Sequence, residues 1–330
     1  MVSSSSSSSS SSAAAVSFSE GNAINLMPRL LPVLFMTVAL AGCSTTTVPA
    51  APSALATAGS QVGTPWRAEV LAVVQPLAER RLATDNRRGA AADHPLLPLG
   101  LIALGRASGE PRFSGAATRF GVMPGNQTSP ALNNLCAGDV CSAADLLQRP
   151  ELWTGSGQVN DPGRAGLVGL DPSFRRMSAT LFDPEALLFH SDENRTGQGR
   201  FDAALNATAF AALTRMIDAL PAEDPARLEY VALYREMART ITRTQGDDGW
   251  WREPLWDGAG RVDRSASALF VFGLTWGLNS GMLSFNEGEA AALKGWDALR
   301  SPAGLEALQA EDRGLGALML AAAQMAVRQW

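Results

Sequence analysis

The segment Ser-Ala-Ser-Ala-Leu-Phe-Val-Phe-Gly-Leu-Thr-Trp-Gly-Leu, residues 265–278, decides the fold. It is apolar all round, and a helix of that composition has to be buried on every side. Residues 286–299 follow closely and are amphipathic, which predicts a helix with one face in water. Together the two segments predict a helical hairpin with an inner and an outer member.

The same pattern recurs along the chain on both sides of this hairpin. Residues 96–107 and 314–328 predict buried helices, and residues 203–220 predict a strong helix that Pro221 stops. Residues 225–244 carry apolar side chains on one face. No segment shows convincing β-alternation, so the sequence predicts an all-α fold of helical hairpins. Further helices are predicted over residues 66–84, 143–153 and 171–182, and a loop over residues 113–139.

The composition fits one large domain and argues against a nucleic-acid partner. The 330 residues suffice for one sizeable core and are too few for two comfortable ones. The net charge of −5 is spread along the chain, whereas a nucleic-acid surface needs a clustered basic face. The sequence has no phosphate-binding glycine loop, Ser/His/Asp arrangement or metal-spaced cluster, so we expect neither a cofactor nor a metal.

The N-terminal part predicts export and lipid attachment. Residues 1–26 contain a serine run and are predicted to be disordered or to precede the true start. Residues 27–43 combine a positive charge, an apolar run and Leu-Ala-Gly-Cys, which resembles the lipobox of bacterial lipoproteins and implies acylation of Cys43. Residues 44–62 are predicted to form a flexible tether, and residues 63–330 the helical domain.

This leader predicts a protein held at the bacterial cell envelope by a lipid in the membrane. Ser44 suits the outer membrane, facing the periplasm, if the host is Gram-negative. The alternative is an ordinary signal peptide with a chance cysteine at position 43.

Cys136 and Cys141 lie close together in the sequence. An oxidising periplasm would allow a small disulfide loop between them, and two buried free thiols are the alternative. A zinc site is a weaker interpretation, because His94 and His190 are the only histidines and neither is near in sequence.

The loop that follows residues 225–244 carries residue types suited to sugar binding. Residues 245–252 read Gln-Gly-Asp-Asp-Gly-Trp-Trp-Arg. Indole rings cover the apolar faces of sugars, and the charged Asp248 and Arg252 bind hydroxyls or carboxylates. The alternative is a capped turn whose tryptophans, including Trp251, pack between helices.

Seven segments resemble, in the same order, those of the unsaturated rhamnogalacturonyl hydrolases, glycoside hydrolase family 105, which is related to family 88. Residues 245–252 are similar to the family's Q-x-x-D-G-x-W-R, and residues 181–193 to its L-F-D-P-E-x-x-L-F-Y-H-x-x-D-E. Asp263 begins the segment that stands in place of E-T-S-G-x-A-F-F. The other similar segments lie at residues 220–237, 274–283, 295–299 and 313–321.

The resemblance implies an (α/α)6 barrel that acts on an acidic oligosaccharide. Such enzymes add water across the C4=C5 double bond of an unsaturated uronic acid, and the product opens to release the neighbouring sugar. One aspartic acid can protonate C4 and activate the water, provided that shielding raises its pKa. About nine helices are visible where about twelve are expected, so the barrel is predicted to be incomplete on its N-terminal side.

The catalytic aspartate falls in a poorly matching segment. Asp145 is the nearest match to the family's acid/base aspartate, although the spacing to Pro150 would put Ala144 in that place. A carboxylate that complements a helix N-terminus is the alternative for Asp145. Asp93 is the candidate for a second family aspartate that binds substrate, and a solvated loop carboxylate is its alternative.

Two more substrate-binding candidates come from the resemblance. His190 matches the family histidine, and a structural histidine is the alternative. Asn206 is the only residue retained from the family's R-G-N-G-W segment, unless the register places residues 197–199 there. With so many departures, two functions stand open: a hydrolase of unsaturated uronyl oligosaccharides, and a pseudoenzyme that binds glycan or a protein partner.

Overall fold

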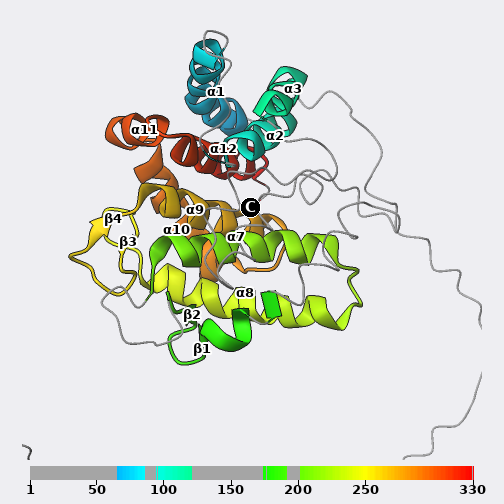
Figure 1. Cartoon of the computed structure of the whole chain (residues 1–330), viewed down its shortest axis with the longest axis vertical. Coiled ribbons are helices and arrows are strands. Elements are labelled where there is room, and N and C mark those ends of the chain that lie inside the picture. The colour runs from blue at the N-terminus through cyan, green and yellow to red at the C-terminus, as the bar shows by residue number, and fades with distance from the viewer. Residues whose placement is uncertain are drawn as a thin grey trace, which may run out of the picture. The chain divides into compact units, whose positions relative to one another are not determined.

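The computed structural model describes residues 65–85, 94, 96–120, 174–175, 177–191, 201–328 and 330. All of them belong to one compact unit, Ser60–Trp330. Its regular structure is helical apart from two short hairpins (Figure 1). The prediction of an all-α fold is confirmed.

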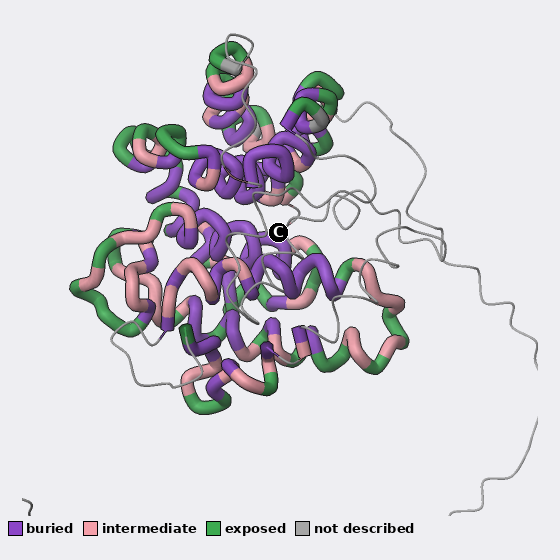
Figure 2. Tube along the Cα trace, in the orientation of Figure 1, coloured by how far each residue is buried: buried purple, intermediate pink, exposed green. Residues whose placement is uncertain are grey.

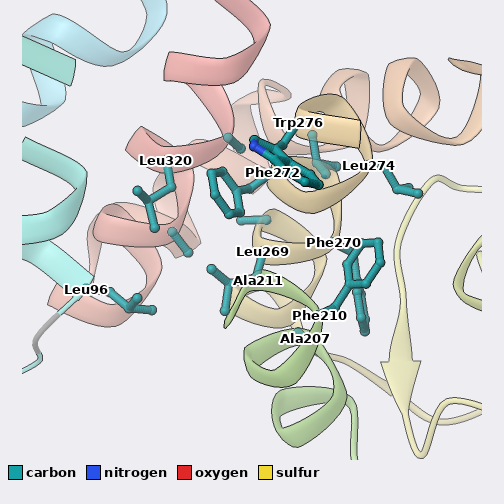
Figure 3. Packing of buried hydrophobic residues seen from close by; sticks show 14 of the residues in the cluster. Leu96, Ala207, Phe210, Ala211, Leu269, Phe270, Phe272, Leu274, Trp276 and Leu320 are labelled. Carbon is teal, nitrogen blue, oxygen red and sulfur yellow. The ribbon is translucent and has the colours of Figure 1, made fainter. Parts of the chain in front are cut away.

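Four inner helices form the centre of the described part. They pack in the order α7 (Ala203–Ala219), α9 (Arg264–Asn279), α12 (Asp312–Ala326) and α2 (Leu96–Ser108). Each is buried on nearly all sides, as Figure 2 shows, because its sequence offers no polar face. Their aromatic and aliphatic side chains, among them Phe210, Phe270 and Leu320, fill a shared core (Figure 3).

The outer helices cover this centre with their apolar faces. Helix α8 (Pro225–Arg243) packs against α7, α10 (Phe285–Leu299) against α9, and α3 (Pro111–Ala117) against α2. Helices α1 (Pro65–Asp85) and α11 (Pro302–Gln309) pack against α12. Each of the inner helices α2, α7 and α9 is thus followed in the chain by an outer helix that packs on it, which is the arrangement of helical hairpins that the sequence predicts.

The first helices close against the last one, as Figure 1 shows for α1, α2 and α12. The backbones of α2 and α12 meet at Gly100 and Gly316, where a Cβ on Gly100 would lie only 2.6 Å from the Gly316 carbonyl oxygen. Arg81 of α1 donates two hydrogen bonds, of 2.7 and 3.0 Å, to the buried carboxylate of Asp312. Trp66 donates its indole N–H to the Met325 carbonyl at 2.8 Å.

Two antiparallel hairpins lie in the segments that lead into inner helices. Strand β1 (Phe182–Asp183) pairs with β2 (Leu188–Phe189), and β3 (Arg252–Glu253) pairs with β4 (Arg261–Val262). The second hairpin ends one residue before α9, and the first is bound to the first turn of α7 through Asn206. Both hairpins therefore lie at the N-terminal ends of inner helices.

The structure differs from the sequence prediction at two short helices. Residues 113–120 fall in the predicted loop but form most of α3 and the 3-10 turn Thr118–Phe120, and α11 was not predicted. Both helices begin at a proline that suits the first helical position, Pro111 and Pro302. They are too short to display a clear apolar period. The predicted helix at residues 143–153 lies outside the described residues.

A histidine at the start of α2 makes stability depend on pH. The Nδ1 atom of His94 accepts a hydrogen bond from the Leu96 amide at 3.2 Å, which requires an unprotonated nitrogen. Burial first, and then the charge of Arg313, lower the pKa of His94 to about 4, while Asp312 opposes the shift. The unfolded chain therefore binds more protons than the folded one between about pH 6.5 and about pH 4.

We expect the free energy of unfolding to fall by up to about 3 kcal/mol as the pH drops through that window, because the folded pKa lies below the unfolded one. Chemical denaturation across this pH range measures the effect. The control is His94→Asn, whose side-chain oxygen can still accept from Leu96 but does not titrate. An equal pH slope in the variant and the parent protein would show that His94 does not cause it.

Candidate functional site

The candidate site lies where the two hairpins meet the N-terminal ends of α7 and α9. Asp202 caps α7 by accepting a hydrogen bond from the Leu205 amide at 2.7 Å. Asp263 caps α9 in the same way, through the Ala266 amide at 2.9 Å. Carboxylates are favoured at such positions because the first amides of a helix lack partners within it. The predicted substrate residue Asp263 thus has a defined structural role as a helix cap.

Glu253 of β3 lies close enough to these two carboxyl groups for their charges to affect its pKa. Its Oε2 atom accepts a hydrogen bond of 2.5 Å from the Ala203 amide at the first turn of α7. Burial raises the pKa of Glu253, the hydrogen bond from Ala203 opposes the rise, and the negative charges of Asp202 and Asp263 add to it. Glu253 therefore keeps its proton to higher pH than an ordinary glutamate, which suits a proton donor.

Glu253 was not predicted from the sequence, although it directly follows the loop at residues 245–252 that drew attention there. The available signal was a carboxylate next to a candidate sugar loop. Nothing in the sequence, however, brings Glu253 to the start of α7, since the hairpin and the helix are separated by more than thirty residues.

His190 directly follows strand β2 of the first hairpin and is paired with an aspartate. Its Nε2 atom is 3.0 Å from the Asp183 Oδ2 atom, and its side chain has no exposed surface. The ring lies against Phe201, with the two ring centres 4.9 Å apart. The sequence predicted His190 as a site residue but not the role of Asp183.

Phe201 connects His190 to an exposed tryptophan. Its ring centre is 6.4 Å from the ring of Trp256, and its carbonyl oxygen accepts from the Leu255 amide at 3.0 Å. Trp256 lies in the turn between β3 and β4, and its side chain is 52% exposed. An exposed indole is suited to stacking on a sugar ring. This tryptophan was missed, because the sequence directs attention to the tandem tryptophans five residues earlier.

The loop at residues 245–252 differs from the expected platform. Trp251 has no exposed surface, donates its indole N–H to the Ile241 carbonyl at 2.7 Å, and packs on Phe270. Its ring is thus part of the core, which is the alternative that the sequence left open. Arg252 forms a two-pronged ion pair with Asp248, at 3.0 and 2.6 Å, and this pair lowers the pKa of Asp248.

Asn206 holds the first hairpin to α7. Its Oδ1 atom accepts from the Phe189 amide at 2.7 Å, and its Nδ2 atom donates to the carbonyls of Phe189 and Asp202 at 2.9 and 3.0 Å. The side chain is fully buried. Its hydrogen bonds go to backbone groups, so the geometry describes a residue that fixes the hairpin rather than one that faces a ligand.

Five predicted residues lie outside the described residues, so their predicted roles stay predictions: Asp93, Asp145, Cys43, Cys136 and Cys141. Within the described ranges, no group of three or more His, Cys, Asp and Glu side chains is arranged to hold a metal ion. None of the helices in those ranges is long and apolar enough to cross a membrane.

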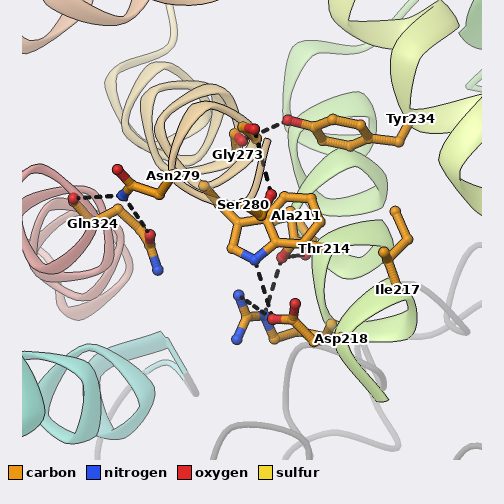
Figure 4. Close-up of polar contacts among 12 residues, drawn as sticks. Ala211, Thr214, Ile217, Asp218, Tyr234, Gly273, Asn279, Ser280 and Gln324 are labelled. Atoms are coloured by element: carbon orange, nitrogen blue, oxygen red, sulfur yellow. Dashed lines mark hydrogen bonds and ion pairs between the residues drawn. The ribbon is translucent and has the colours of Figure 1, made fainter. Parts of the chain in front are cut away.

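A second polar cluster lies at the other end of α7 and α9. Asp218 accepts from the Trp276 indole at 3.1 Å and pairs with the buried Arg215 at 3.2 Å (Figure 4). Burial raises the pKa of Asp218, and Arg215 opposes the rise. Asp218 is about 22 Å along the helix from the start of α7, so the cluster joins two inner helices and does not belong to the candidate site.

Solved structures share this architecture. A structure of glycosyl hydrolase family 88 from Bacteroides vulgatus is 19% identical, with a TM-score of 0.58, over 79% of this chain and 99% of that one. A structure from Salmonella enterica, assigned as a possible member of family 105, is 14% identical, with a TM-score of 0.61, over 86% of this chain and 100% of that one. The chain therefore has the fold of the six-hairpin glycosidases, and the predicted (α/α)6 architecture is confirmed.

The sequence of the C-terminal half is similar to known proteins. Residues 170–323 match the model of Glycosyl Hydrolase Family 88, so the predicted resemblance is confirmed. An unsaturated 3S-rhamnoglycuronyl hydrolase from Alteromonas sp. (strain LOR) is 26% identical over 212 residues, which are 57% of this chain and 51% of the relative. The chain thus spans about half the length of that relative.

Proposed function

We propose that this protein hydrolyses unsaturated uronyl oligosaccharides of the rhamnogalacturonan type by hydrating their C4=C5 bond. The observation that carries the proposal is the gathering of Glu253, the paired His190 and the exposed Trp256 at the N-terminal ends of inner helices, within a family 88 segment. The name of the Alteromonas relative, an unsaturated 3S-rhamnoglycuronyl hydrolase, supports an unsaturated uronyl sugar as the substrate.

The reaction requires a proton donor, a water molecule and a site that binds an acidic sugar. A carboxyl group gives its proton to C4 as the π bond breaks, and water adds its oxygen to C5 while one of the water's protons passes to the carboxylate. The resulting hemiketal opens and releases the neighbouring sugar. A protonated carboxyl is the right donor only if its pKa is raised, as burial raises that of Glu253. Asp145 is our candidate for the main acid and base, and Glu253 is our candidate for a second proton donor.

We also propose that the enzyme works at the cell envelope, held by a lipid on Cys43. The support is the Leu-Ala-Gly-Cys segment at residues 40–43, which follows an apolar run and precedes a Pro- and Ala-rich stretch suited to a tether. An envelope location would bring the enzyme to oligosaccharides that a polysaccharide lyase has already cut.

The test is loss of ultraviolet absorbance by the unsaturated uronate when the protein is mixed with lyase-treated pectin. We expect Asp145→Ala to lower the rate by a factor of about 100 or more, since a positioned acid or base contributes that much. Glu253→Gln keeps an oxygen that can accept from Ala203, so we expect a smaller loss.

Each result of this assay has a defined meaning. A loss in Glu253→Gln that equals or exceeds the loss in Asp145→Ala would move the proton transfer to Glu253. No absorbance change with the parent protein would overturn the hydrolase proposal and favour a glycan-binding protein without catalysis. Circular dichroism spectra of all three proteins establish that the variants remain folded.

A further inference from the structure

The carboxylate of Asp183 is held in one orientation by the backbone that follows it. Its Oδ1 atom accepts hydrogen bonds from the amides of Glu185, at 2.9 Å, and Ala186, at 3.0 Å. These two amide donors hold Oδ1 toward the turn between β1 and β2. The other oxygen, Oδ2, therefore faces His190. The side chain is only 5% exposed, so water does not compete for these contacts.

The ring of His190 is held just as firmly. Its own backbone amide donates to the Leu181 carbonyl at 2.9 Å, which places the residue at the end of the hairpin. Phe201 covers one face of the ring, and the Nε2 atom lies at hydrogen-bonding distance, 3.0 Å, from the Asp183 Oδ2 atom. Since a carboxylate can only accept, this contact requires that Nε2 carry the proton.

The other ring nitrogen has no partner among the described residues. The Nδ1 atom of His190 is buried and has no hydrogen bond to any described residue. In the neutral ring protonated at Nε2, Nδ1 is an acceptor with a free lone pair. Buried polar atoms are nearly always satisfied, and an exception indicates a partner beyond the described residues, such as a bound ligand.

We propose that Asp183 is a positioning residue, which fixes His190 in the tautomer protonated at Nε2 so that Nδ1 accepts a hydrogen bond from a hydroxyl group of the bound sugar. The choice of sugar hydroxyl as the partner rests on the proposed function. The fixed tautomer rests on the hydrogen bonds of Asp183 alone.

The tautomer is measured directly by nitrogen NMR of the full chain labelled with ¹⁵N-histidine. The chain has two histidines, so a His94→Asn variant assigns the remaining signals to His190. At mildly alkaline pH we expect Nε2 of His190 to show the shift of a protonated nitrogen and Nδ1 that of an unprotonated one. A protonated Nδ1 in the parent protein would overturn the proposal.

The variant Asp183→Asn is expected to change Nε2 of His190 from a hydrogen-bond donor to an acceptor. The amide oxygen of asparagine can keep the two contacts to Glu185 and Ala186, which turns its NH₂ group toward His190. Nε2 must then accept, so we expect the proton to move to Nδ1. The matched control is Asp224→Asn, because Asp224 also accepts from the amide two residues ahead but lies on the outer helix α8. An unchanged tautomer in Asp183→Asn would contradict the proposed role.

Kinetics with the unsaturated oligosaccharide test the sugar contact. We expect Asp183→Asn to raise KM roughly tenfold and to change kcat less, because the sugar hydroxyl loses its acceptor. Asp224→Asn should leave both constants unchanged. A reversed tautomer with an unchanged KM would overturn the sugar contact.

If the parent protein shows no turnover, the proposed function is wrong, but the tautomer of His190 and its sugar contact can still be tested. The NMR spectra of the free protein still decide the tautomer. Titration of the labelled protein with the oligosaccharide then decides the contact: a shift of the Nδ1 signal in the parent and not in Asp183→Asn supports it, and no shift in the parent overturns it.

Discussion

Gly316→Val is expected to open the contact between the first and last helices and to lower the free energy of unfolding by about 3 kcal/mol or more. A Cβ at position 316 would overlap the backbone of Leu96 and Leu97, and backbone cannot move aside as a flexible side chain can. Helices α2 and α12 would have to separate along their length. Thermal unfolding followed by circular dichroism should show a midpoint lower by roughly 10 °C.

Gly115→Ala is the matched control for this prediction. Gly115 lies in the short outer helix α3, and a Cβ there would have no atom within 4 Å. Because alanine has the higher helix propensity, we expect this variant to be unchanged or stabilised by up to about 1 kcal/mol. Equal midpoints for Gly316→Val and the parent would show that α2 and α12 do not meet as described.

The long helices could be predicted because their sequences satisfy several independent rules at once. Residues 265–278 are apolar all round and form α9 with one more residue at each end. The helix predicted before Pro221 ends at Ala219, and the next begins at Pro225 behind the cap residue Asp224. Caps and breakers locate helix ends, whereas α3 and α11 depend on contacts with α2 and α12 that no local pattern contains.

The candidate site was less predictable, since it consists of residues that are distant in sequence. His190 could be identified from its motif, but its partner Asp183 was visible only once β1 and β2 had paired. Glu253 acquires its raised pKa from burial and from Asp202 and Asp263, which α7 and α9 bring close. Residue type alone also could not say which tryptophan is exposed, and the sequence favoured Trp251 over Trp256.

Trp251→Ala decides whether that ring serves the core or the substrate, and we expect it to lower the free energy of unfolding by about 3–5 kcal/mol. The indole is fully buried, packs on Phe270 with ring centres 5.3 Å apart, and satisfies the Ile241 carbonyl at 2.7 Å. Removing it leaves a large cavity and takes away one of the hydrogen bonds that the Ile241 carbonyl accepts, while that from the Thr244 hydroxyl remains. Trp251→Phe should cost less, because it refills most of the cavity and loses only the hydrogen bond.

For the exposed Trp256 we expect the opposite result, a small effect on stability and a larger one on sugar binding. Since half of its surface is already in water, Trp256→Ala should change the free energy of unfolding by less than about 1 kcal/mol, and we expect it to weaken oligosaccharide binding through the lost stacking surface. Thermal unfolding and binding titrations on both variants separate the two roles. If Trp251→Ala melted like the parent but bound sugar more weakly, Trp251 would be the platform after all, because a ring that contributes nothing to stability cannot be one that the core requires.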